Sequence, residues 1–332
     1  MNYPKLTIFI LAHNNEKTIK KTLASILNQT YPNKEIIVSD NYSDDKTEEI
    51  VKSLGVTIKR NEKPAKADQD YIGCYYNYNS CLNLIRSDFI SFCHGDDIYK
   101  KDMMKKQMEF LINNPEVGAV FTAGDEIDEN DNIVNELKVK EKIYNFEQLF
   151  KAILRKGNTF LWTPTFMART DVFRNGDTFN EIKFRTSADL DMWFKIAKNY
   201  KIGLLNKNLF QRRIGGGGTS YQHLCISRAN FFKVVDYHLQ FNKADRKSLR
   251  QYEYQRRFDD TLVAMNLLIK GDSPKKILAR RLTPSLFIAF FENITIRKIK
   301  ACLIRTALNI AIPIKLSKPL GKLLYKLRYI KN

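Results

Sequence analysis

Carboxylate side chains follow two apolar segments of this sequence, where a bound ligand could use them. Asp40 closes the run EIIVSD, and Asp96 with Asp97 comes just after the run DFISFC, in the segment HGDD. Two adjacent carboxylates behind a buried strand can hold a hard divalent cation that keeps open coordination positions for substrate phosphates. Any one of these residues has an ordinary alternative role, because Asp at a strand end commonly stabilises a turn.

A second acidic pair, Asp189 and Asp191, lies in the segment SADLDMW at the expected start of a helix. Residues two apart do not share a helical face, so we expect the two carboxylates to have different roles. One of them can act as a general base, the group that takes the proton from an attacking hydroxyl. The alternative is that both only complement the positive N-terminal end of the helix.

A basic segment, Gln211 to Arg213, precedes a run of four glycines at 215–218. Arginine side chains beside a Gly-rich segment can clamp a diphosphate group. The alternative is a solvated basic patch on a loop. The glycines have neither the spacing of a P-loop nor that of a dinucleotide-binding GxGxxG motif, so those two nucleotide sites are not supported.

The elements that must position these residues alternate between apolar runs and amphipathic segments. This order predicts an α/β fold with a mostly parallel sheet flanked by helices, whose ligands bind at the carboxyl ends of the strands. In the helix at 187–200 we expect Leu190, Phe194 and Ala197 to face inward. We expect strands at residues 6–12, 35–40, 56–59, 88–93, 118–123 and 163–169, and helices at 15–30, 44–55, 71–86, 102–113, 146–155, 187–200 and at most positions from 221 onward.

Composition limits the classes of protein that fit. The chain has 332 residues, 44% of them hydrophobic, and 14 Gly and 9 Pro, which excludes disordered and collagen-like proteins. Its five cysteines are scattered and contain no CxxC pair, which predicts a reducing compartment and no zinc site. The apolar run at 6–12 is too short for a signal peptide or a membrane span, so we expect a buried strand there.

The formal net charge is +19, and its distribution is uneven. Residues 273–332 contain fourteen basic side chains and one acid, Glu292, a net charge of +13. In the last sixteen residues, SKPLGKLLYKLRYIKN, apolar and cationic residues recur at helical spacing, which predicts an amphipathic helix. Such a tail can dock on an anionic membrane surface or pack on the protein itself.

The segment LTIFILAHNNEKTIKKTLASILNQTYPNKEIIVSDNYSDDKTEEI strongly resembles the N-terminal half of family 2 glycosyltransferases of the GT-A fold. These are inverting enzymes that use nucleotide-diphosphate sugars, and the resemblance covers about residues 5–220. It implies that the DxD metal motif falls on HGDD, with Asp96 and Asp97 as metal-binding residues for Mn²⁺ or Mg²⁺. The general base falls on Asp189, with Asp191 as a second catalytic candidate. It implies that Ala12, His13, Asn14 and Asp40 hold the nucleotide, and with His94, Asp96, Arg212 and Arg213 these residues form the predicted donor-binding set.

The sequence departs from the family pattern at three positions. His94 stands where the first Asp of the DxD motif is common, and Ala188 replaces the Glu that usually precedes the base. Gly215 stands where a His is frequent, and His223 is the candidate substitute. These departures bear on the metal site, on the support of the base and on the contacts to phosphate.

We therefore expect a GT-A glycosyltransferase domain at 1–220 and a mostly helical, basic region at 221–332. The predicted activity is an inverting transfer of a hexose from a UDP-linked sugar to a glycan or lipid-linked hydroxyl, in bacterial surface polysaccharide synthesis. The predicted location is the cytoplasmic face of the cell membrane, without a nucleic-acid partner. Two alternatives stay open: an inactive GT-A domain that binds sugar nucleotides, motivated by His94 and Ala188, and a nucleic-acid-binding protein, motivated by the charge.

Overall fold

The computed structural model describes residues 3–62, 72–137, 139–214, 221–239 and 252. By its internal contacts the chain divides into two units, 1–241 and 242–332, and the strands and helices named below lie in the first unit. The predicted basic tail lies outside the described residues. A domain boundary after residue 220 stays a prediction. Among the described residues, no helix combines the length and apolar character needed to cross a membrane.

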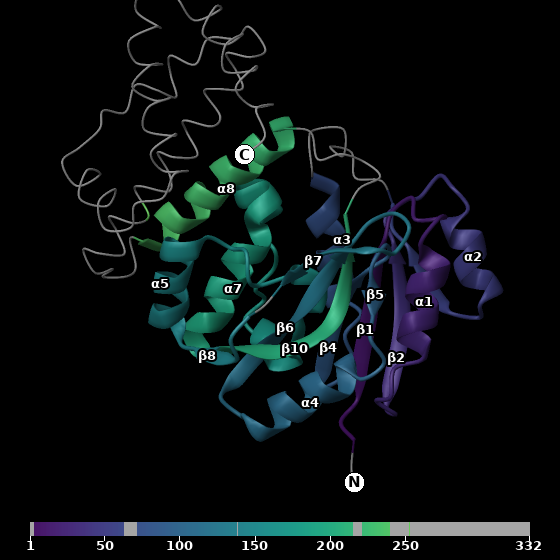
Figure 1. The fold of residues 1–332 in the computed structure, drawn as a ribbon, viewed down its shortest axis with the longest axis horizontal. Helices are drawn as coiled ribbons and strands as arrows, with labels where there is room; N and C mark the ends of the chain where they lie inside the picture. The colour runs from purple at the N-terminus through teal and green to yellow at the C-terminus, as the bar shows by residue number, and fades with distance from the viewer. Residues whose placement is uncertain (1–2, 63–71, 138, 215–220, 240–251, 253–332) are drawn as a thin grey trace, which may run out of the picture. The chain divides into compact units, whose positions relative to one another are not determined.

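A single mixed sheet of ten strands forms the centre of this unit, in the order β3-β2-β1-β4-β9-β6-β10-β5, with β7 beside β6 and β8 beside β10 (Figure 1). The pairs β3–β2, β2–β1, β1–β4 and β6–β10 are parallel, and the other pairs are antiparallel. The strands are β1 (Leu6–Ala12), β2 (Lys34–Asp40), β3 (Thr57–Arg60), β4 (Phe89–His94), β5 (Ile98–Tyr99), β6 (Val117–Ile127), β7 (Ile133–Leu137), β8 (Lys142–Tyr144), β9 (Met167–Arg169) and β10 (Lys201–Arg213).

The predicted α/β class is confirmed, and most predicted elements are present with shifted ends. The expected strand at 163–169 is shorter: its first half is a 3₁₀ turn, Thr163–Thr165, and only Met167–Arg169 pairs in the sheet. The expected helices correspond to α1 (Ile19–Leu27), α2 (Thr47–Ser53), α3 (Ile72–Leu82), α4 (Met103–Asn113), α5 (Phe146–Lys156), α7 (Ala188–Asn199) and α8 (Tyr221–Leu239), and the sequence did not indicate the short α6 (Glu181–Phe184).

The longest strand, β10, was missed by sequence reasoning, as were β5, β7 and β8, since no element was assigned to residues 201–213. It runs parallel to β6, and its register shifts between Leu205 and Asn208 and again before Phe210. The polar residues NKN at 206–208 fall at this irregularity and interrupt the apolar pattern that marks a strand. As a result, Arg212 and Arg213 end a strand rather than occupy a loop.

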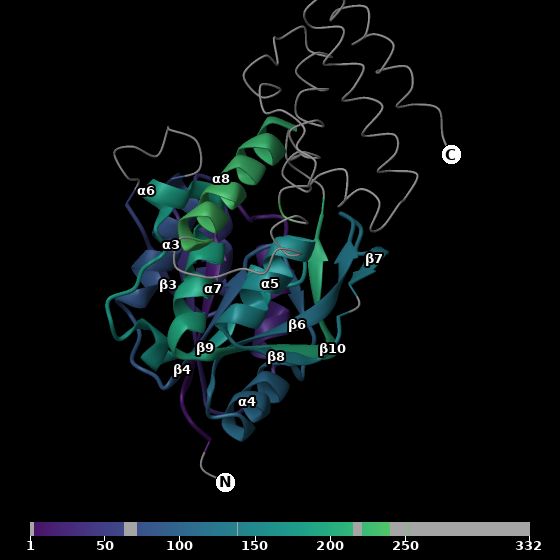
Figure 2. The same ribbon diagram turned by 90° about the vertical axis from the view of Figure 1, so that its left-hand side faces the viewer.

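Helices flank the sheet (Figure 2), and the cores on its two faces differ. One is aliphatic and rich in methionine, where α1 and α4 bury residues such as Leu23 and Met108 against Ile8 and Ile10 of β1. Phe9 points to the opposite face, because side chains alternate along a strand. There α3 and α7 contribute to an aromatic core that contains Tyr78, Phe92, Phe166, Phe179 and Trp193.

Candidate functional site

The predicted site residues meet at one edge of the sheet because three parallel strands end together there. In the register of the sheet, Ala12 of β1 lies beside Asp40 of β2, and Leu11 lies beside His94 of β4. The end of β10 reaches the same place, where the backbone N–H of Arg213 donates to Asp97 Oδ1 at 2.9 Å. The edge therefore combines residues from the second, fourth and tenth strands.

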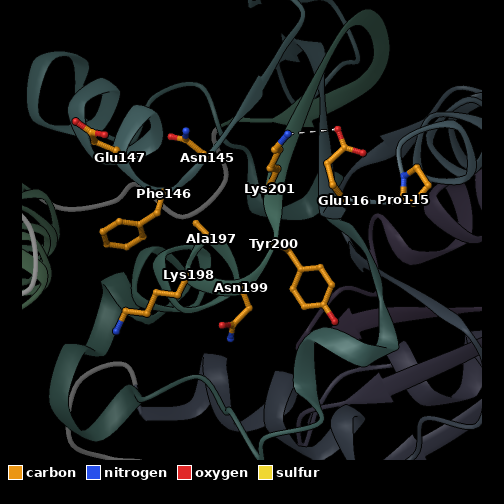
Figure 3. A pocket seen from close by; sticks show the side chains of 10 residues that line it. All are labelled: Pro115, Glu116, Asn145, Phe146, Glu147, Ala197, Lys198, Asn199, Tyr200 and Lys201. Atoms are coloured by element: carbon orange, nitrogen blue, oxygen red, sulfur yellow. Dashed lines mark ion pairs between the residues drawn. The ribbon is translucent and has the colours of Figure 1, made fainter.

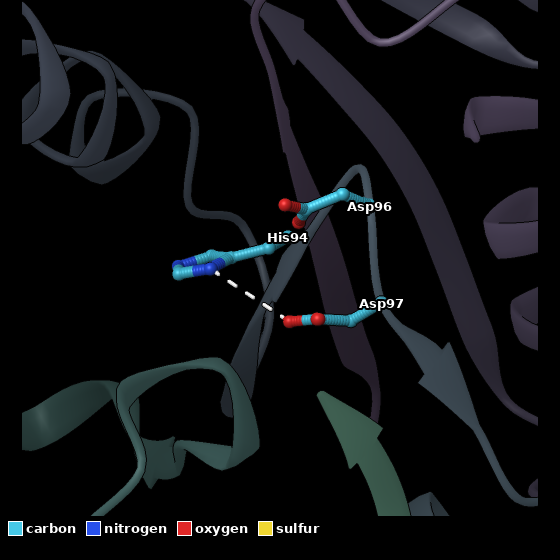
Figure 4. Close-up of side chains that lie close together, drawn as sticks. All are labelled: His94, Asp96 and Asp97. Atoms are coloured by element: carbon cyan, nitrogen blue, oxygen red, sulfur yellow. Dashed lines mark ion pairs between the residues drawn. The ribbon is translucent and has the colours of Figure 1, made fainter. Parts of the chain in front are cut away.

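His94, Asp96 and Asp97 form a compact cluster, with one ligand atom of each within 4.8 Å of the others (Figure 4). Gly95, between His94 and Asp96, lies close to the Asn15 side chain. A Cβ on Gly95 would lie 2.7 Å from Asn15 Oδ1. The carbonyl oxygen of Gly95 also accepts hydrogen bonds from the Thr18 and Thr22 hydroxyls of the first helical segment.

Asp97 is the buried member of this cluster, with 2% exposure. Its Oδ1 accepts the Arg213 N–H, while its Oδ2 accepts no hydrogen bond from the described part of the chain. Burial, and then the negative charge of Asp96, raises the pKa of Asp97 well above its usual value. Burial disfavours the ionised form of this carboxylate, and a bound cation would stabilise that form.

His94 is held from two sides. Its Nε2 lies 2.6 Å from the Tyr78 hydroxyl, and its backbone N–H donates to the Tyr99 hydroxyl at 2.7 Å. Burial lowers the pKa of His94, which Asp96 opposes and Arg212 reinforces. The imidazole is therefore held in its neutral form, the form that can bind a metal ion.

Asp189 lies in the first turn of α7. Its Oδ2 accepts the Thr163 hydroxyl at 2.7 Å, and its Oδ1 accepts the N–H of Leu190. Burial raises the pKa of Asp189, although the hydrogen bonds from Thr163, Leu190 and Tyr75 oppose the rise. The Tyr75 ring lies 5.6 Å from the Tyr78 ring, so two aromatic residues of α3 connect Asp189 to His94.

Asp191 has contacts different from those of Asp189. It is fully buried, its Oδ1 lies 2.8 Å from Nε2 of His238 in α8, and its Oδ2 lies 3.1 Å from Lys195 Nζ. This placement argues against a catalytic role for Asp191 and gives it a structural one, because the side chain joins α7 to α8. The inward positions Leu190, Phe194 and Ala197 are buried, as predicted.

The two arginines at the end of β10 have different environments. Arg212 is 42% exposed on its side chain, pairs with Glu126 at 2.6 Å and lies over the Trp162 ring at 5.0 Å. The Arg213 side chain is 9% exposed, and its guanidinium donates to the carbonyl oxygens of Asp96 and Asp128 and pairs with Asp131. These contacts argue against Arg213 as a direct donor ligand. It instead fastens the HGDD turn to the β6–β7 hairpin.

The predicted nucleotide-binding residues follow β1 and β2. Asp40 is fully buried, and both its carboxylate oxygens accept hydrogen bonds from Ser43, so its contacts are those of a turn residue. His13 is exposed, and its Nδ1 lies 2.7 Å from the Asn41 carbonyl oxygen. Asn14 has a φ of 52°, and its N–H donates to Ser43 while its side-chain oxygen accepts the Asp44 N–H. Two loops are thereby joined into one surface at the strand ends.

Tyr75, Tyr78 and Thr163 are site residues that sequence reasoning missed. Their side chains contact Asp189 or His94 from α3 and from the turn before β9, far away in the sequence. No local pattern marks them, since aromatic residues in an amphipathic segment usually belong to the core. Only the tertiary fold brings these three residues into contact with Asp189 or His94.

A separate depression of about 520 Å³ lies at the opposite end of the strands (Figure 3). Glu116 and Lys201, an ion pair of 3.6 Å, line it beside the first residues of β6 and β10. Because the predicted site residues occupy the other end of these strands, this depression is not the candidate site.

Comparisons with known proteins agree with this geometry. The profile of the family described as Glycosyl transferase family 2 matches residues 7–176. An uncharacterised glycosyltransferase of Methanocaldococcus jannaschii is 29% identical over 222 residues, which cover 64% of this chain and 72% of that one. A chondroitin synthase of Escherichia coli is 26% identical over 255 residues, 76% of this chain but only 34% of the relative.

Among solved structures, S. aureus TarS 1–349 superposes with a TM-score of 0.58 at 15% sequence identity, covering 98% of this chain and 93% of that chain. The same TarS fragment has been solved with UDP-GlcNAc. The mannosyltransferase PcManGT from Pyrobaculum calidifontis, solved with GDP-Man and Mn²⁺, superposes with a TM-score of 0.58 at 15% identity, covering 97% and 85% of the two chains. At these identities the similarity shows the fold.

Proposed function

We propose, from the premise that the chain belongs to glycosyl transferase family 2, that it transfers a sugar from a nucleotide diphosphate to an acceptor hydroxyl with inversion. The chain is a glycosyltransferase with a GT-A fold. The observation that carries the proposal is the link, through Tyr75 and Tyr78, between a cation-binding cluster and the carboxylate of Asp189. A cation in the cluster would stabilise the leaving diphosphate, and the Asp189 carboxylate would accept the proton of the attacking hydroxyl.

Asp96 and Asp97 fit a divalent cation, Mn²⁺ or Mg²⁺, because their oxygens are hard ligands and one oxygen of Asp97 is buried without a hydrogen bond among the described residues. When bound, such an ion neutralises the negative charge that develops on the departing diphosphate. Support comes from a neighbour in fold, PcManGT, which was solved with Mn²⁺. Arg212, which is partly exposed at the same edge, is the arginine we assign to the phosphates.

Asp189 is the proposed general base. As an oxygen of the acceptor hydroxyl bonds to the anomeric carbon, the bond from that carbon to the phosphate oxygen breaks. The bonding electrons leave with the diphosphate, and the hydroxyl proton passes to the Asp189 carboxylate. Thr163 and the Leu190 N–H orient the carboxylate for this step. A base placed in this way accelerates a reaction by about 10²- to 10⁴-fold.

For the donor we propose a UDP-linked hexose, supported by the complex of TarS with UDP-GlcNAc, although PcManGT was solved with GDP-Man. For the acceptor we propose a hydroxyl of a glycan or of a lipid-linked glycan in bacterial surface polysaccharide synthesis. A chondroitin synthase and a hyaluronan synthase among the relatives support a polysaccharide product. His13 and Asn14, at the ends of β1 and β2, are the residues we assign to the nucleotide.

We also propose that the basic tail docks the enzyme on the cytoplasmic face of a membrane. The charge of +13 over residues 273–332 supports this, because each Lys or Arg near an anionic surface contributes about 1 kcal/mol. The full chain should float with anionic vesicles at low salt and release as salt rises. Replacing Lys318, Lys322 and Lys326 with Glu should weaken flotation. Equal binding to neutral vesicles would contradict the docking.

A thermal-shift screen of nucleotide diphosphates and sugar nucleotides, with and without Mn²⁺, tests the donor assignment. A ligand at a hundred times its dissociation constant stabilises the folded protein by about 2.7 kcal/mol. We expect UDP or a UDP-sugar to give the largest shift, and the shift to need the metal. Donor binding without hydrolysis or transfer would favour the alternative of an inactive sugar-nucleotide-binding domain, motivated by His94 and Ala188.

A further inference from the structure

We infer that His94 is itself a metal ligand, through Nδ1, and that its imidazole shifts the preference of the site from Mg²⁺ toward transition metals such as Mn²⁺ and Co²⁺. The inference rests on the proposed function only in that a cation binds at HGDD. It concerns the residue at which this chain departs from the DxD pattern.

The first argument is the direction of the imidazole. Nδ1 of His94 lies 3.8 Å from Oδ2 of Asp97, and Figure 4 shows the imidazole and both carboxylates turned toward a common space. A distance of 3.8 Å is too long for a hydrogen bond. Two metal–ligand bonds of about 2.0–2.2 Å span up to about 4.4 Å, so one ion can bind both atoms.

The second argument is the orphaned oxygen. Asp97 is 98% buried, and its Oδ2 receives no hydrogen bond from the residues that the structure describes. A buried carboxylate oxygen without a partner costs free energy, which a cation between Asp97 and His94 would recover. His94 does not meet this need by hydrogen bonding, as the distance shows.

The third argument is the support of the imidazole on its far side. Nε2 of His94 lies 2.6 Å from the hydroxyl oxygen of Tyr78, which is 1% exposed and packed among aromatic rings. If Nε2 carries the proton and donates it to this oxygen, Nδ1 keeps its lone pair for a metal. Metal-binding histidines are commonly oriented by such a contact, whose loss typically costs 10- to 100-fold in metal affinity.

The metal preference follows from the chemistry of the ligands. Mg²⁺ favours sites made of oxygen atoms, whereas an imidazole nitrogen favours transition metals, in an order that rises from Mn²⁺ to Co²⁺. An aspartate at position 94 would give an all-oxygen site. The presence of His at this position therefore favours Co²⁺ and Mn²⁺ over Mg²⁺.

Electron spin echo spectroscopy of Mn²⁺ bound to the full chain, with UDP and separately with GDP, tests the ligand directly. A coordinated imidazole gives ¹⁴N modulation, which should become ¹⁵N modulation in protein grown with ¹⁵N-histidine. The modulation should disappear in His94→Asp and persist in the control His223→Gln. Bound Mn²⁺ without nitrogen modulation, or modulation that vanishes only in His223→Gln, would overturn the inference.

Metal titrations test the preference. In His94→Asp, the ratio of the Mg²⁺ to the Co²⁺ dissociation constant should fall by about tenfold. Tyr78→Phe should weaken Mn²⁺ binding by about tenfold or more while the nitrogen modulation stays. An unchanged ratio in His94→Asp contradicts the inference, and so does absence of Mn²⁺ binding by wild-type protein. If either of these two results is found but the enzyme still transfers sugar, the proposed function stands and only the metal inference fails. If the nitrogen signal is present but no sugar is transferred, the proposed function fails and the metal inference stands.

Discussion

Replacing Arg213 should destabilise the protein much more than replacing its neighbour Arg212. The Arg213 guanidinium is nearly buried, donates to the Asp128 carbonyl at 2.8 Å and to the Asp96 carbonyl at 3.1 Å, and pairs with Asp131 at 2.6 Å. Arg213→Met leaves these acceptors without their partner. Breaking a buried ion pair costs about 3–5 kcal/mol. Since Asp131 is 31% exposed and also pairs with Lys21, we expect about 3 kcal/mol.

Arg212→Met is the matched control. Arg212 is 42% exposed and makes one ion pair, with Glu126, so its loss should cost less than about 1 kcal/mol. Its effect should appear instead as weaker donor binding.

Urea unfolding followed by tryptophan fluorescence measures both variants. Trp162 and Trp193 are the only tryptophans of the chain, and both lie in the unit that contains the site. Two results would refute the reasoning: an Arg213→Met variant within about 0.5 kcal/mol of wild type, or equal losses in the two variants.

Three further predictions concern the two aspartates of α7 and Thr163, which donates a hydrogen bond to Asp189. Asp191→Asn should lower the unfolding free energy by about 1–3 kcal/mol, because it weakens the contacts to His238 and Lys195. Turnover per folded molecule should stay nearly unchanged. A selective loss of turnover would restore Asp191 as a catalytic candidate. The rate should fall as pH drops through the pKa of Asp189, which burial raises above its usual value, so the acidic limb of the kcat/KM profile should lie above the range of an exposed Asp. Thr163→Val removes a hydrogen bond that lowers this pKa and should move the limb to higher pH, whereas the control Thr170→Val should not; a limb that moves to lower pH would contradict the assignment.

The sequence predicted the parallel half of the sheet because its strands are short, continuous apolar runs. β1 has the predicted bounds, and β2 and β4 each lie within one residue of theirs at both ends. It failed at β10, whose bulge at residues 206–208 places polar residues within the strand. Without that strand, Arg212 and Arg213 could not be distinguished from a basic loop.

The site was predictable only where its residues follow a strand or begin a helix. Asp96, Asp97 and Asp189 stand at such positions, so their types and places in the sequence indicated chemistry. The roles of Tyr78 and Thr163 depend on contacts between segments far apart, which a single sequence does not show. A single sequence also does not show the different surroundings of Asp189 and Asp191, although their spacing already indicated that they lie on different faces of the helix.

The most direct test of the central claim is the anomeric configuration of the product, measured by NMR with the sugar nucleotide that gives the largest thermal shift, for wild type and Asp189→Asn. The account predicts that wild type inverts the configuration of the donor. It also predicts that Asp189→Asn binds this donor with nearly unchanged affinity but transfers sugar at least about 100-fold more slowly. A product that retains the donor configuration, or an Asp189→Asn variant that transfers sugar at a rate close to wild type, would contradict it.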